Sequence, residues 1–471
     1  MAVKTRQERK VVGTNVRKVD GLALACGRPK FTLDVDIPGA LVGRILRSPH
    51  AHARIVSIDT SEAEALPGVA CILHYGNTKR IPFTTAGQGW PEPSPYDAVL
   101  FDSKVRYVGD RVAAVAAESE EIAEQALRLI RVEYEVLPAA LSVEEALVEG
   151  APIIHDEEDA EGIYDARRNI AAAVDIPVGD IQRGFSESDV VVETTCEIPY
   201  SQHTPLEPHC VIAYFDEDGR LVIRTSTQVP FHVRRIVARA LELPLERIRV
   251  VKPRIGGGFG CKQEIILEPV AAALALRTGR AVKMALDRSE VFVSSRTRHP
   301  MRVRVKLGAK KDGRLQAIEM EATSNTGAYG AHSLTVLSNV GSKTLPLYNK
   351  APHLWFHGKA VYTNLPVAGA YRGYGATQGY FALEVAMDEL AERLGMDPVE
   401  LRLANHIRAG ETSPIFEKIG EGREGKPQIV RSCALSECLK VGAERIGWKE
   451  KRAQKRRQGS WVYGVGMSGS M

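Results

Sequence analysis

The chain has 471 residues, of which 44% are hydrophobic and 25% are charged. These values are typical of globular proteins and exclude a disordered, collagenous or coiled-coil chain. No stretch of about 18 uncharged apolar residues occurs, which predicts no membrane span, and no apolar stretch of the kind found in a signal peptide follows the basic N-terminus. The net charge of +4, from 62 basic and 58 acidic residues, does not favour a nucleic-acid-binding protein.

The chain has seven cysteines, an odd number, and they are scattered along the sequence. They form no C-x-x-C pair and no ferredoxin-like series, so neither a disulfide framework nor an iron–sulfur site is expected. The pattern is typical of free thiols in a reducing compartment, and we therefore expect a cytoplasmic protein. The cysteines are Cys26, Cys71, Cys196, Cys210, Cys261, Cys433 and Cys438.

Residues 40–150 alternate strand and helix signals. Short apolar stretches bounded by turn residues predict strands at residues 41–46 and 111–117. A serine cap, early acidic residues and an apolar 3–4 spacing predict a helix over residues 119–130. Strict alternation then predicts a strand over residues 131–136. Together these elements predict a compact α+β unit.

Residues 151–180 are richer in acidic and turn residues, and we predict a linker there. Strand patterns dominate beyond it, and two later helices are predicted at residues 268–278 and 380–394, each ended by a glycine. The fold class is therefore α+β. Residues 461–471 have the pattern of a strand that has only begun. The strands predicted after the linker are residues 189–193, 210–215 and 220–226.

A glycine-rich stretch, Ile255-Gly-Gly-Gly-Phe-Gly-Cys-Lys-Gln-Glu264, is the first candidate functional motif. Consecutive glycines can present backbone N–H groups to an anion or an oxo ligand without interference from side chains. The stretch is not a P-loop, because Cys261 and Gln263 occupy positions that need glycine and serine or threonine. The motif alone leaves a tight turn and an anion cradle as equal alternatives.

A second glycine-containing stretch, Asn364–Gln378, leads into the later predicted helix. Arg372 lies between glycine-flanked aromatic residues, and its guanidinium could bind a phosphate, a pterin edge or an oxo group. Tyr371 and Tyr374 could flank a planar ligand. The alternative is an exposed loop whose arginine pairs with a carboxylate.

Other polar residues are more simply structural. His203 and His209 have no spacing typical of metal ligands, so we predict hydrogen-bonded core histidines. The stretches Asp287–Glu290 and Arg296–Pro300 predict buried or interface ion pairs. Glu264 follows the glycine loop, but its orientation is open, and no spacing typical of a serine or cysteine nucleophile occurs.

Four stretches in order resemble one known family, the molybdenum hydroxylases, which include xanthine dehydrogenases and aldehyde oxidases. They are residues 36–55, residues 105–117, Gly256-Gly-Gly-Phe-Gly-Cys-Lys262 and Ala370-Tyr-Arg-Gly-Tyr-Gly375. The resemblance implies an N-terminal arm over residues 1–16, an a/b hammerhead domain over 17–150, the linker over 151–180, and the first half of a molybdopterin-binding domain over 181–471.

The resemblance also implies a molybdenum–molybdopterin cofactor, often the cytosine dinucleotide form, with the metal held by the pterin and water supplying the inserted oxygen. Arg372 and Gln263 would be catalytic, and Phe259 and Gly260 would line the apical oxo group through their backbone. Either Gln202 or His203 would approach the apical ligand. The implied cofactor-binding residues are Gly257, Gly258, Phe259, Gly260, Gln202, Gln228 and Arg372; the implied substrate-binding residues are Tyr374, Asn339 and Gln263.

Departures from the family pattern narrow the substrate. In xanthine-oxidising members of the family, a glutamate often follows the loop lysine, and this chain has Gln263 there. The arginine that binds substrate in those members falls near Asn339 in this chain. Both changes weaken recognition of xanthine itself. Cys261 replaces a glycine, and Ala368–Tyr371 lacks the copper-binding cysteine of carbon monoxide dehydrogenases. We therefore expect a hydroxylase of an N-heteroaromatic ring, either purine or nicotinate-like. The alternatives are an aldehyde oxidoreductase and a 4-hydroxybenzoyl-CoA reductase-like subunit.

The family's general-base glutamate and its remaining cofactor loops lie further along than the sequence extends. We therefore expect a split subunit that acts with a second molybdopterin-binding subunit, an iron–sulfur (2Fe-2S) subunit and an FAD subunit. The non-enzymatic alternative is a truncated chain, which is inactive without its second half.

Overall fold

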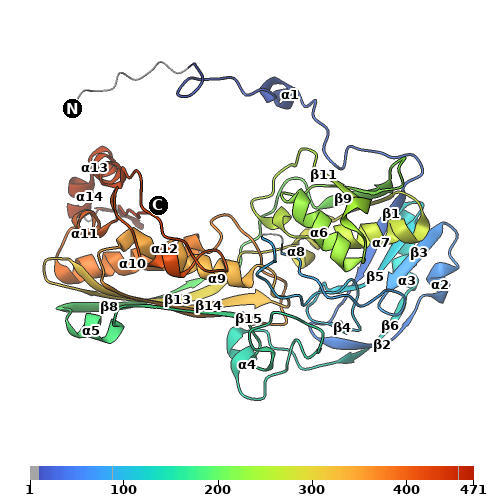
Figure 1. Ribbon diagram of the computed structural model, residues 1–471, viewed down its shortest axis with the longest axis horizontal. Helices are drawn as coiled ribbons and strands as arrows, with labels where there is room; N and C mark the ends of the chain where they lie inside the picture. Colours follow the sequence, from blue (N-terminus) through green and yellow to red (C-terminus); the bar gives the residue numbers. More distant parts are fainter. Residues whose placement is uncertain (1–9, 87–88, 455) are drawn as a thin grey trace.

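The computed structural model describes residues 10–86, 89–454 and 456–471. Two large sheets lie side by side (Figure 1). The first has seven strands in the order β11-β10-β9-β12-β1-β5-β3. Its strands are β1 (Leu41–Arg47), β3 (Val69–His74), β5 (Arg111–Ala117), β9 (Cys210–Phe215), β10 (Leu221–Thr225), β11 (Ile248–Val251) and β12 (Val282–Ala285).

This first sheet joins segments from both predicted domains. β1 pairs in parallel with β12, with Leu41 opposite Val282, and pairs antiparallel with β5. α6 (Pro230–Ala240) and α7 (Glu268–Thr278) pack their apolar residues into the same core as these strands. α7 ends at Gly279 as predicted, because this residue has φ +65° and continues no helix.

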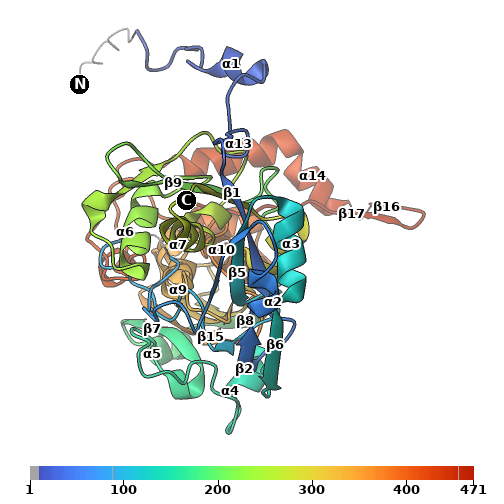
Figure 2. The same cartoon turned by 90° about the vertical axis from the view of Figure 1, so that its right-hand side faces the viewer.

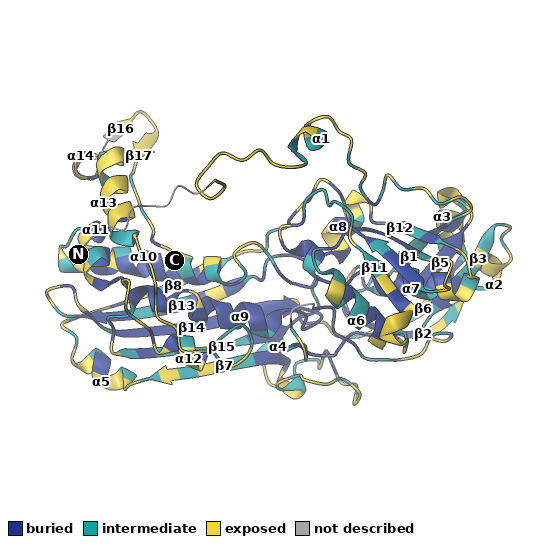
Figure 3. Cartoon of the chain, turned by 45° about the horizontal axis from the view of Figure 1, so that its top comes forward, coloured by how far each residue is buried: buried dark blue, intermediate teal, exposed yellow. Residues whose placement is uncertain are grey.

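The second sheet has five strands in the order β7-β15-β14-β13-β8. α9 (Ser333–Ser342) and α10 (Ala376–Leu394) pack on it and fill its core. Buried residues follow the strands of both sheets and these helices (Figure 3). The strands are β7 (Ile170–Val178), β8 (Val190–Ile198), β13 (Met301–Ala309), β14 (Leu315–Gly327) and β15 (His353–Tyr362).

β7 corrects one sequence expectation. The predicted linker over residues 151–180 contains this nine-residue strand, which pairs antiparallel with β15. Three alanines and Pro177 hide the strand in the sequence, because neither residue type favours strands. Proline is tolerated here because β7 lies at the edge of the sheet.

The predicted early α+β unit is present. β2 (Ala53–Asp59), β4 (Lys104–Val105) and β6 (Arg131–Val136) form a small sheet. The backbone N–H of Ile122 donates to the Ser119 hydroxyl, which caps α3. The remaining helices and strands are α1 (Gly21–Ala25), α2 (Ser61–Glu64), α3 (Glu120–Leu129), α4 (Val143–Leu147), α5 (Ile181–Ser186), α8 (Arg288–Ser294), α11 (Pro398–Asn405), α12 (Ile415–Lys418), α13 (Leu435–Ile446), α14 (Trp448–Ala453), β16 (Arg456–Gln458) and β17 (Trp461–Tyr463).

The N-terminal end of the described chain projects from the body, whereas the last residues return to it, where the backbone N–H of Met471 donates to the Tyr380 hydroxyl over 3.2 Å. Of the predicted arm over residues 1–16, residues 1–9 lie outside the described residues, and the part that follows leads away from the sheets. The strand expected after residue 461 is β17, which forms an exposed hairpin with β16 (Figure 2). Among the helices of the described residues, none combines the length and the apolar character needed to cross a bilayer.

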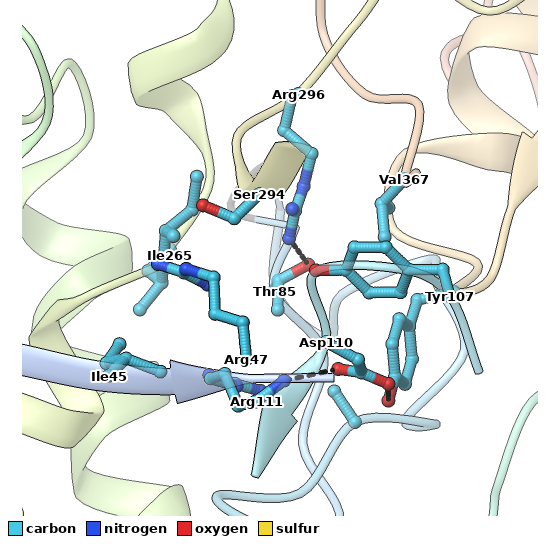
Figure 4. Close-up of a pocket in the computed structure, with 13 residues that line it drawn as sticks. Ile45, Arg47, Thr85, Tyr107, Asp110, Arg111, Ile265, Ser294, Arg296 and Val367 are labelled. Atoms are coloured by element: carbon cyan, nitrogen blue, oxygen red, sulfur yellow. Dashed lines mark hydrogen bonds between the residues drawn. The ribbon is translucent and has the colours of Figure 1, made fainter. Parts of the chain in front are cut away.

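A polar cavity of about 30 Å³ lies between residues 45–111 and residues 265–367 (Figure 4). Tyr329 donates its hydroxyl proton to Asp110 Oδ2 over 2.9 Å, and Arg296 Nη2 donates to Thr85 Oγ1 over 3.1 Å. This volume holds about one or two water molecules. The cavity is therefore part of the packing between the two regions and is too small for an organic substrate.

Candidate functional site

The glycine loop has a backbone that only glycine accommodates at two positions. Gly257 and Gly260 have φ values of +98° and +115°. A Cβ at Gly260 would lie 2.4 Å from the carbonyl oxygen of Ala370, and one at Gly258 would lie 2.5 Å from Gln228 Oε1. The loop is therefore packed closely against Gln228 and Ala370, and its glycine positions leave no space for side chains.

A buried ion pair fixes the start and end of this loop. Lys262 Nζ lies 2.8 Å from Glu207 Oε2, and the Lys262 side chain is fully buried. The same carboxylate oxygen accepts the backbone N–H of Gly256 over 2.7 Å. Glu207 was missed by sequence reasoning. The only signal was a charged residue between two prolines, in Pro205–Pro208.

The arginine loop packs directly on the glycine loop. The backbone N–H of Arg372 donates to the carbonyl oxygen of Phe259 over 2.9 Å. The guanidinium of Arg372 is exposed, and within the described residues it forms no hydrogen bond or ion pair. The alternative in which this arginine pairs with a carboxylate is therefore wrong for the described chain.

Gln228 lies beside the meeting point of the two loops. Its Oε1 accepts the backbone N–H of Gly260 over 3.1 Å. Its own backbone N–H donates to the carbonyl oxygen of Lys262 over 2.8 Å. With the amide oxygen engaged, the NH₂ group of the half-buried side chain is left to donate to an acceptor.

Tyr371 and Tyr374 have different environments. The guanidinium of Arg298 lies 4.0 Å from the ring centroid of Tyr371, and the His203 ring lies 4.2 Å from it. Tyr371 is therefore packed within the protein and cannot readily flank a ligand. Tyr374 has φ +49°, and its hydroxyl forms a short hydrogen bond with His332 Nδ1.

His332 and Asn339 lie on the inner side of the arginine loop. The His332 ring meets the Tyr374 ring edge-on, at 5.4 Å and 90°. Asn339 is buried on α9, where its amide oxygen accepts the Ser342 hydroxyl over 3.2 Å. A Cβ at Gly375 would lie 3.1 Å from the Asn339 Cβ. Asn339 therefore packs against the arginine loop at Gly375 and helps to hold its position. His332 was missed because nothing in the sequence places it near residue 374.

Glu264 lies against the Asn364–Gln378 stretch, because a Cβ at Gly369 would lie 2.0 Å from Glu264 Oε1. Its fully buried side chain forms an ion pair with Arg296, and Thr85 Oγ1 donates to it over 3.1 Å. Burial is the largest single effect and raises the pKa of this carboxyl. The electrostatic effects of Arg296 and His332, together with the hydrogen bonds from Arg296 and Thr85, outweigh burial and hold the pKa below its ordinary value. Glu264 is thus an ionised link between the glycine loop and the hammerhead segment, which settles the orientation that the sequence left open.

Gln263 and Gln202 are held differently. The Gln263 backbone N–H donates to the carbonyl oxygen of Gly260 over 2.9 Å, and its half-buried side chain forms no hydrogen bond within the described residues. Gln202 donates through Nε2 to the carbonyl oxygen of Val291 over 3.1 Å and accepts the backbone N–H of His203 over 2.8 Å. Gln202 is therefore tied to α8, whereas Gln228 contacts the loop itself.

The two histidines are core residues, as predicted. His203 contacts the carbonyl oxygens of Ala370 and Arg296, and His209 contacts that of Cys261. Burial lowers the pKa of both, to about 3 for His209, so its ring is neutral. Within the described residues, no group of three or more His, Cys, Asp or Glu side chains could hold a metal ion.

The predicted ion pairs are present in part. Asp287 caps α8 in a reciprocal capping box with Glu290, which also pairs with Arg47 over 3.1 Å. Arg298 instead stacks on Tyr371 and donates to the carbonyl oxygen of Arg372 over 2.9 Å. All seven cysteines are unpaired, in agreement with the sequence expectation. Burial raises the pKa of Cys261 to about 12, which makes its thiol inert.

Comparison with known proteins supplies the remaining evidence. Residues 163–406 match the model of the molybdopterin cofactor-binding domain, and residues 26–138 match that of the aldehyde oxidase and xanthine dehydrogenase a/b hammerhead domain. The chain belongs to the molybdenum hydroxylases. The α+β fold class and the hammerhead-plus-cofactor-domain organisation predicted from the sequence are thereby confirmed.

Two curated relatives differ in length. The chain is 42% identical to the "Probable hypoxanthine oxidase" of Escherichia coli O157:H7, over 98% of this chain and 51% of that protein. It is 36% identical to the nicotinate dehydrogenase large molybdopterin subunit of Eubacterium barkeri, over 94% of this chain and 99% of that subunit. The chain thus spans about half of the first relative and nearly all of the second.

A solved structure has the same fold. Quinoline 2-oxidoreductase from Pseudomonas putida 86 superimposes with a TM-score of 0.79 and 29% sequence identity. The superposition covers 95% of this chain and 56% of that chain. The overall fold of the chain is therefore that of a known oxidoreductase structure.

Proposed function

We propose that this molybdenum hydroxylase chain is the cofactor-holding subunit of an enzyme that oxidises an electron-poor carbon of an N-heteroaromatic ring. The observation that carries the proposal is the direct contact of the two loops, in which Arg372 donates its backbone N–H to Phe259. This contact places a guanidinium, unpaired among the described residues, beside a glycine-rich loop. Both features suit an anionic, oxo-bearing ligand.

The residues present fit a molybdenum–molybdopterin group. Gly257, Gly258 and Gly260 bring the loop into close contact with Pro205, Gln228 and Ala370. Within the described residues, the Gln228 NH₂ group forms no hydrogen bond and could donate to the group. Arg372 would balance the negative charge of the oxo or pterin side. When bound, the group supplies the redox chemistry by which oxygen from water enters the substrate. Gln202 is a second candidate for the same side, although its amide is already hydrogen-bonded.

Uncharged side chains would recognise the substrate. Tyr374 would offer its ring to a planar substrate, with His332 fixing its orientation. Gln263 would donate or accept a hydrogen bond at the ring edge, whereas Asn339 would act by supporting the loop. Because no charged residue occupies these positions, a ring with both donors and acceptors suits them better than a dianion.

The relatives favour ring substrates. The names of the two curated relatives and of the solved structure refer to hypoxanthine, nicotinate and quinoline, all of which are N-heteroaromatics. An aldehyde oxidoreductase is the second candidate, because the matching hammerhead model covers aldehyde oxidases as well. A 4-hydroxybenzoyl-CoA reductase-like role has no such support.

We propose that catalysis needs partner subunits. Glu264 lies beside Gly369 of the arginine loop, but it is engaged by Arg296 and would not act as the general base. A second molybdopterin-binding subunit would supply the base and the remaining pterin contacts. Separate 2Fe-2S and FAD subunits would remove the electrons, and the cytosine dinucleotide form of the pterin stays a prediction.

The test is co-expression of the chain with the neighbouring reading frames, followed by metal analysis and assay. Molybdenum should co-purify, and hypoxanthine, nicotinate or quinoline should be hydroxylated faster than benzaldehyde. Faster turnover of benzaldehyde would favour the second candidate. A complex that contains the partners but no molybdenum would overturn the proposal, and a chain that binds partners without turnover would support the truncated alternative.

A further inference from the structure

The arginine loop contains a turn whose backbone is strained. Gly373, Tyr374 and Gly375 have φ values of +91°, +49° and +93°, so three consecutive residues lie in the left-handed region. The strain falls on Tyr374, which carries a side chain, and it persists only where the surrounding structure holds it. Within the turn, the backbone N–H of Tyr374 donates to Tyr371, and that of Ala376 donates to Gly373. These bonds are local, so the position of the turn depends on contacts from other segments.

The side chain of Arg298 contacts both ends of this turn. Its Nη2 donates to the carbonyl oxygen of Arg372 over 2.9 Å, before the three residues with positive φ. After them, its Nη1 donates to Thr377 Oγ1 over 2.5 Å and to Gln378 Oε1 over 3.3 Å. The guanidinium also lies 4.0 Å from the ring centroid of Tyr371. The rigid fork of an arginine can span two such points, whereas the single nitrogen of a lysine cannot.

The backbone that carries Arg298 is itself fixed. The backbone N–H of Arg298 donates to the carbonyl oxygen of Ser201 over 2.9 Å. The preceding residue, Thr297, forms an antiparallel bridge with Gln202 and a parallel bridge with Ala368. The guanidinium therefore projects from a segment that is held on both sides, and it can hold the turn in one place.

Both backbone polar groups of Arg372 are bound as a result. Its N–H donates to the carbonyl oxygen of Phe259, and its own carbonyl oxygen accepts from Arg298. The peptide groups on either side of Arg372 are thus fixed, which sets the direction in which its exposed side chain leaves the backbone. A binding side chain is placed most precisely when neighbouring hydrogen bonds fix it in this way.

The acceptors of Arg298 are all neutral. Within the part of the chain that the structure describes, its guanidinium forms no ion pair, whereas the nearby Arg296 pairs with Glu264. A carboxylate at this place would attract the guanidinium of Arg372 and compete with an anionic ligand. Arg298 therefore holds the loop without adding a negative charge beside Arg372.

We propose that Arg298 is a positioning residue, which clamps the turn at both ends and so places Arg372 for its anionic ligand. The ligand meant here is the molybdenum–molybdopterin group, so this inference rests on the proposed function. Arg298 acts through the backbone of Arg372 and needs no contact with the group.

Hydrogen exchange of the full chain, without cofactor, tests the clamp itself. We expect the backbone amides of Tyr374 and Ala376 to exchange at least about tenfold faster in Arg298→Met. Arg298→Lys keeps the charge but loses the fork, and should give a similar increase. Arg452→Met removes an arginine that lies over Trp448 and should leave these amides unchanged. Unchanged exchange in Arg298→Met, or wild-type exchange in Arg298→Lys, would overturn the proposal.

The molybdenum content of the co-purified complex tests whether Arg298 acts through Arg372. Arg298→Met should lower the content at least about threefold in the wild type and by less than about 1.5-fold in Arg372→Ala. Equal fold losses in both backgrounds would show that Arg298 acts independently, which would refute the positioning role. Circular dichroism verifies the folding of each variant. A wild-type complex without molybdenum would refute the proposed function, whereas the exchange experiment would still decide whether Arg298 clamps the turn.

Discussion

Arg372 and Phe259, far apart in the sequence, are joined by a backbone hydrogen bond of 2.9 Å. Each residue has its side chain exposed while its backbone is fixed. The contact sets the guanidinium of one loop beside the glycine-rich backbone of the other. The position of Arg372 therefore depends on the backbone of both loops, whereas its charge is available to a ligand.

Replacing Arg372 by alanine should remove the ligand-facing charge without unfolding the chain. We expect the molybdenum content of the co-purified complex to fall by about tenfold or more. The free energy of unfolding should change by less than about 0.5 kcal/mol, because the guanidinium has no partner among the residues that the structure describes. Arg393→Ala, at another exposed arginine, is the matched control and should retain molybdenum. Full metal content in Arg372→Ala would contradict the role assigned to Arg372.

Replacing Gly260 by alanine should force the two loops apart. The new Cβ would meet the Ala370 carbonyl oxygen at 2.4 Å, and φ is +115°. We expect a loss of about 2–3 kcal/mol in the free energy of unfolding, measured with urea. At Gly279, where φ is +65° and the space is open, alanine should lower it by about 1 kcal/mol. Equal losses of unfolding free energy in the two variants would mean that the contact between the loops does not contribute to stability.

Lys262→Met should destabilise the fold by leaving the Glu207 charge buried without its partner. Removing one member of a buried ion pair lowers stability by about 3–5 kcal/mol. The double variant Lys262→Met with Glu207→Gln should recover part of that loss, because no uncompensated charge remains. Urea unfolding of the wild type, both single variants and the double variant measures the coupling. Purely additive losses would show that the two side chains act independently.

Glu264 should make the fold less stable in acid. Burial raises the carboxyl pKa, but Arg296, His332 and the hydrogen bond from Thr85 together outweigh burial and hold the pKa below its ordinary value of 4.5. Such a group stabilises the fold fully above its unfolded pKa, and the contribution is lost as the pH falls through its folded value. Urea unfolding at a series of pH values should show a decline below about pH 4.5 that Glu264→Gln reduces.

Glu268 provides a control of opposite sign. Burial raises the pKa of its carboxyl above 4.5, and the 2.8 Å hydrogen bond from Thr225 offsets burial only in part. Its stabilising contribution is present below 4.5 and is lost as the pH rises through the folded value. The free energy of unfolding should therefore decline as the pH is raised, and Glu268→Gln should reduce this decline. If Glu264→Gln and Glu268→Gln changed the pH dependence of stability in the same direction, these assignments would be refuted.

The sequence predicts those helices and strands whose bounds are set by residues close to them in the chain. α7 has the predicted bounds, because its apolar residues end at a glycine in the left-handed region. α10 begins at Ala376, four residues before the prediction, because Gly379 reads as a helix breaker. In the structure Gly379 is needed for packing, since a Cβ there would lie 2.4 Å from the Val340 carbonyl oxygen. Such a reason depends on a neighbouring helix and is invisible in the sequence.

The loops of the site could be found from their glycines and Arg372, but their supports could not. Glu207 and His332 act through contacts that only the fold creates, with Lys262 and Tyr374 respectively. Likewise, the orientation of Glu264 depends on Arg296, which lies beyond the next helix. Long-range pairs of this kind leave no spacing signal in one sequence.

The central claim is that the joined loops hold a molybdenum–molybdopterin group. Metal analysis of the chain co-purified with its partner subunits tests it most directly. The account predicts about one molybdenum atom per chain in the wild type and a large loss in Arg372→Ala. A complete wild-type complex without molybdenum would contradict it.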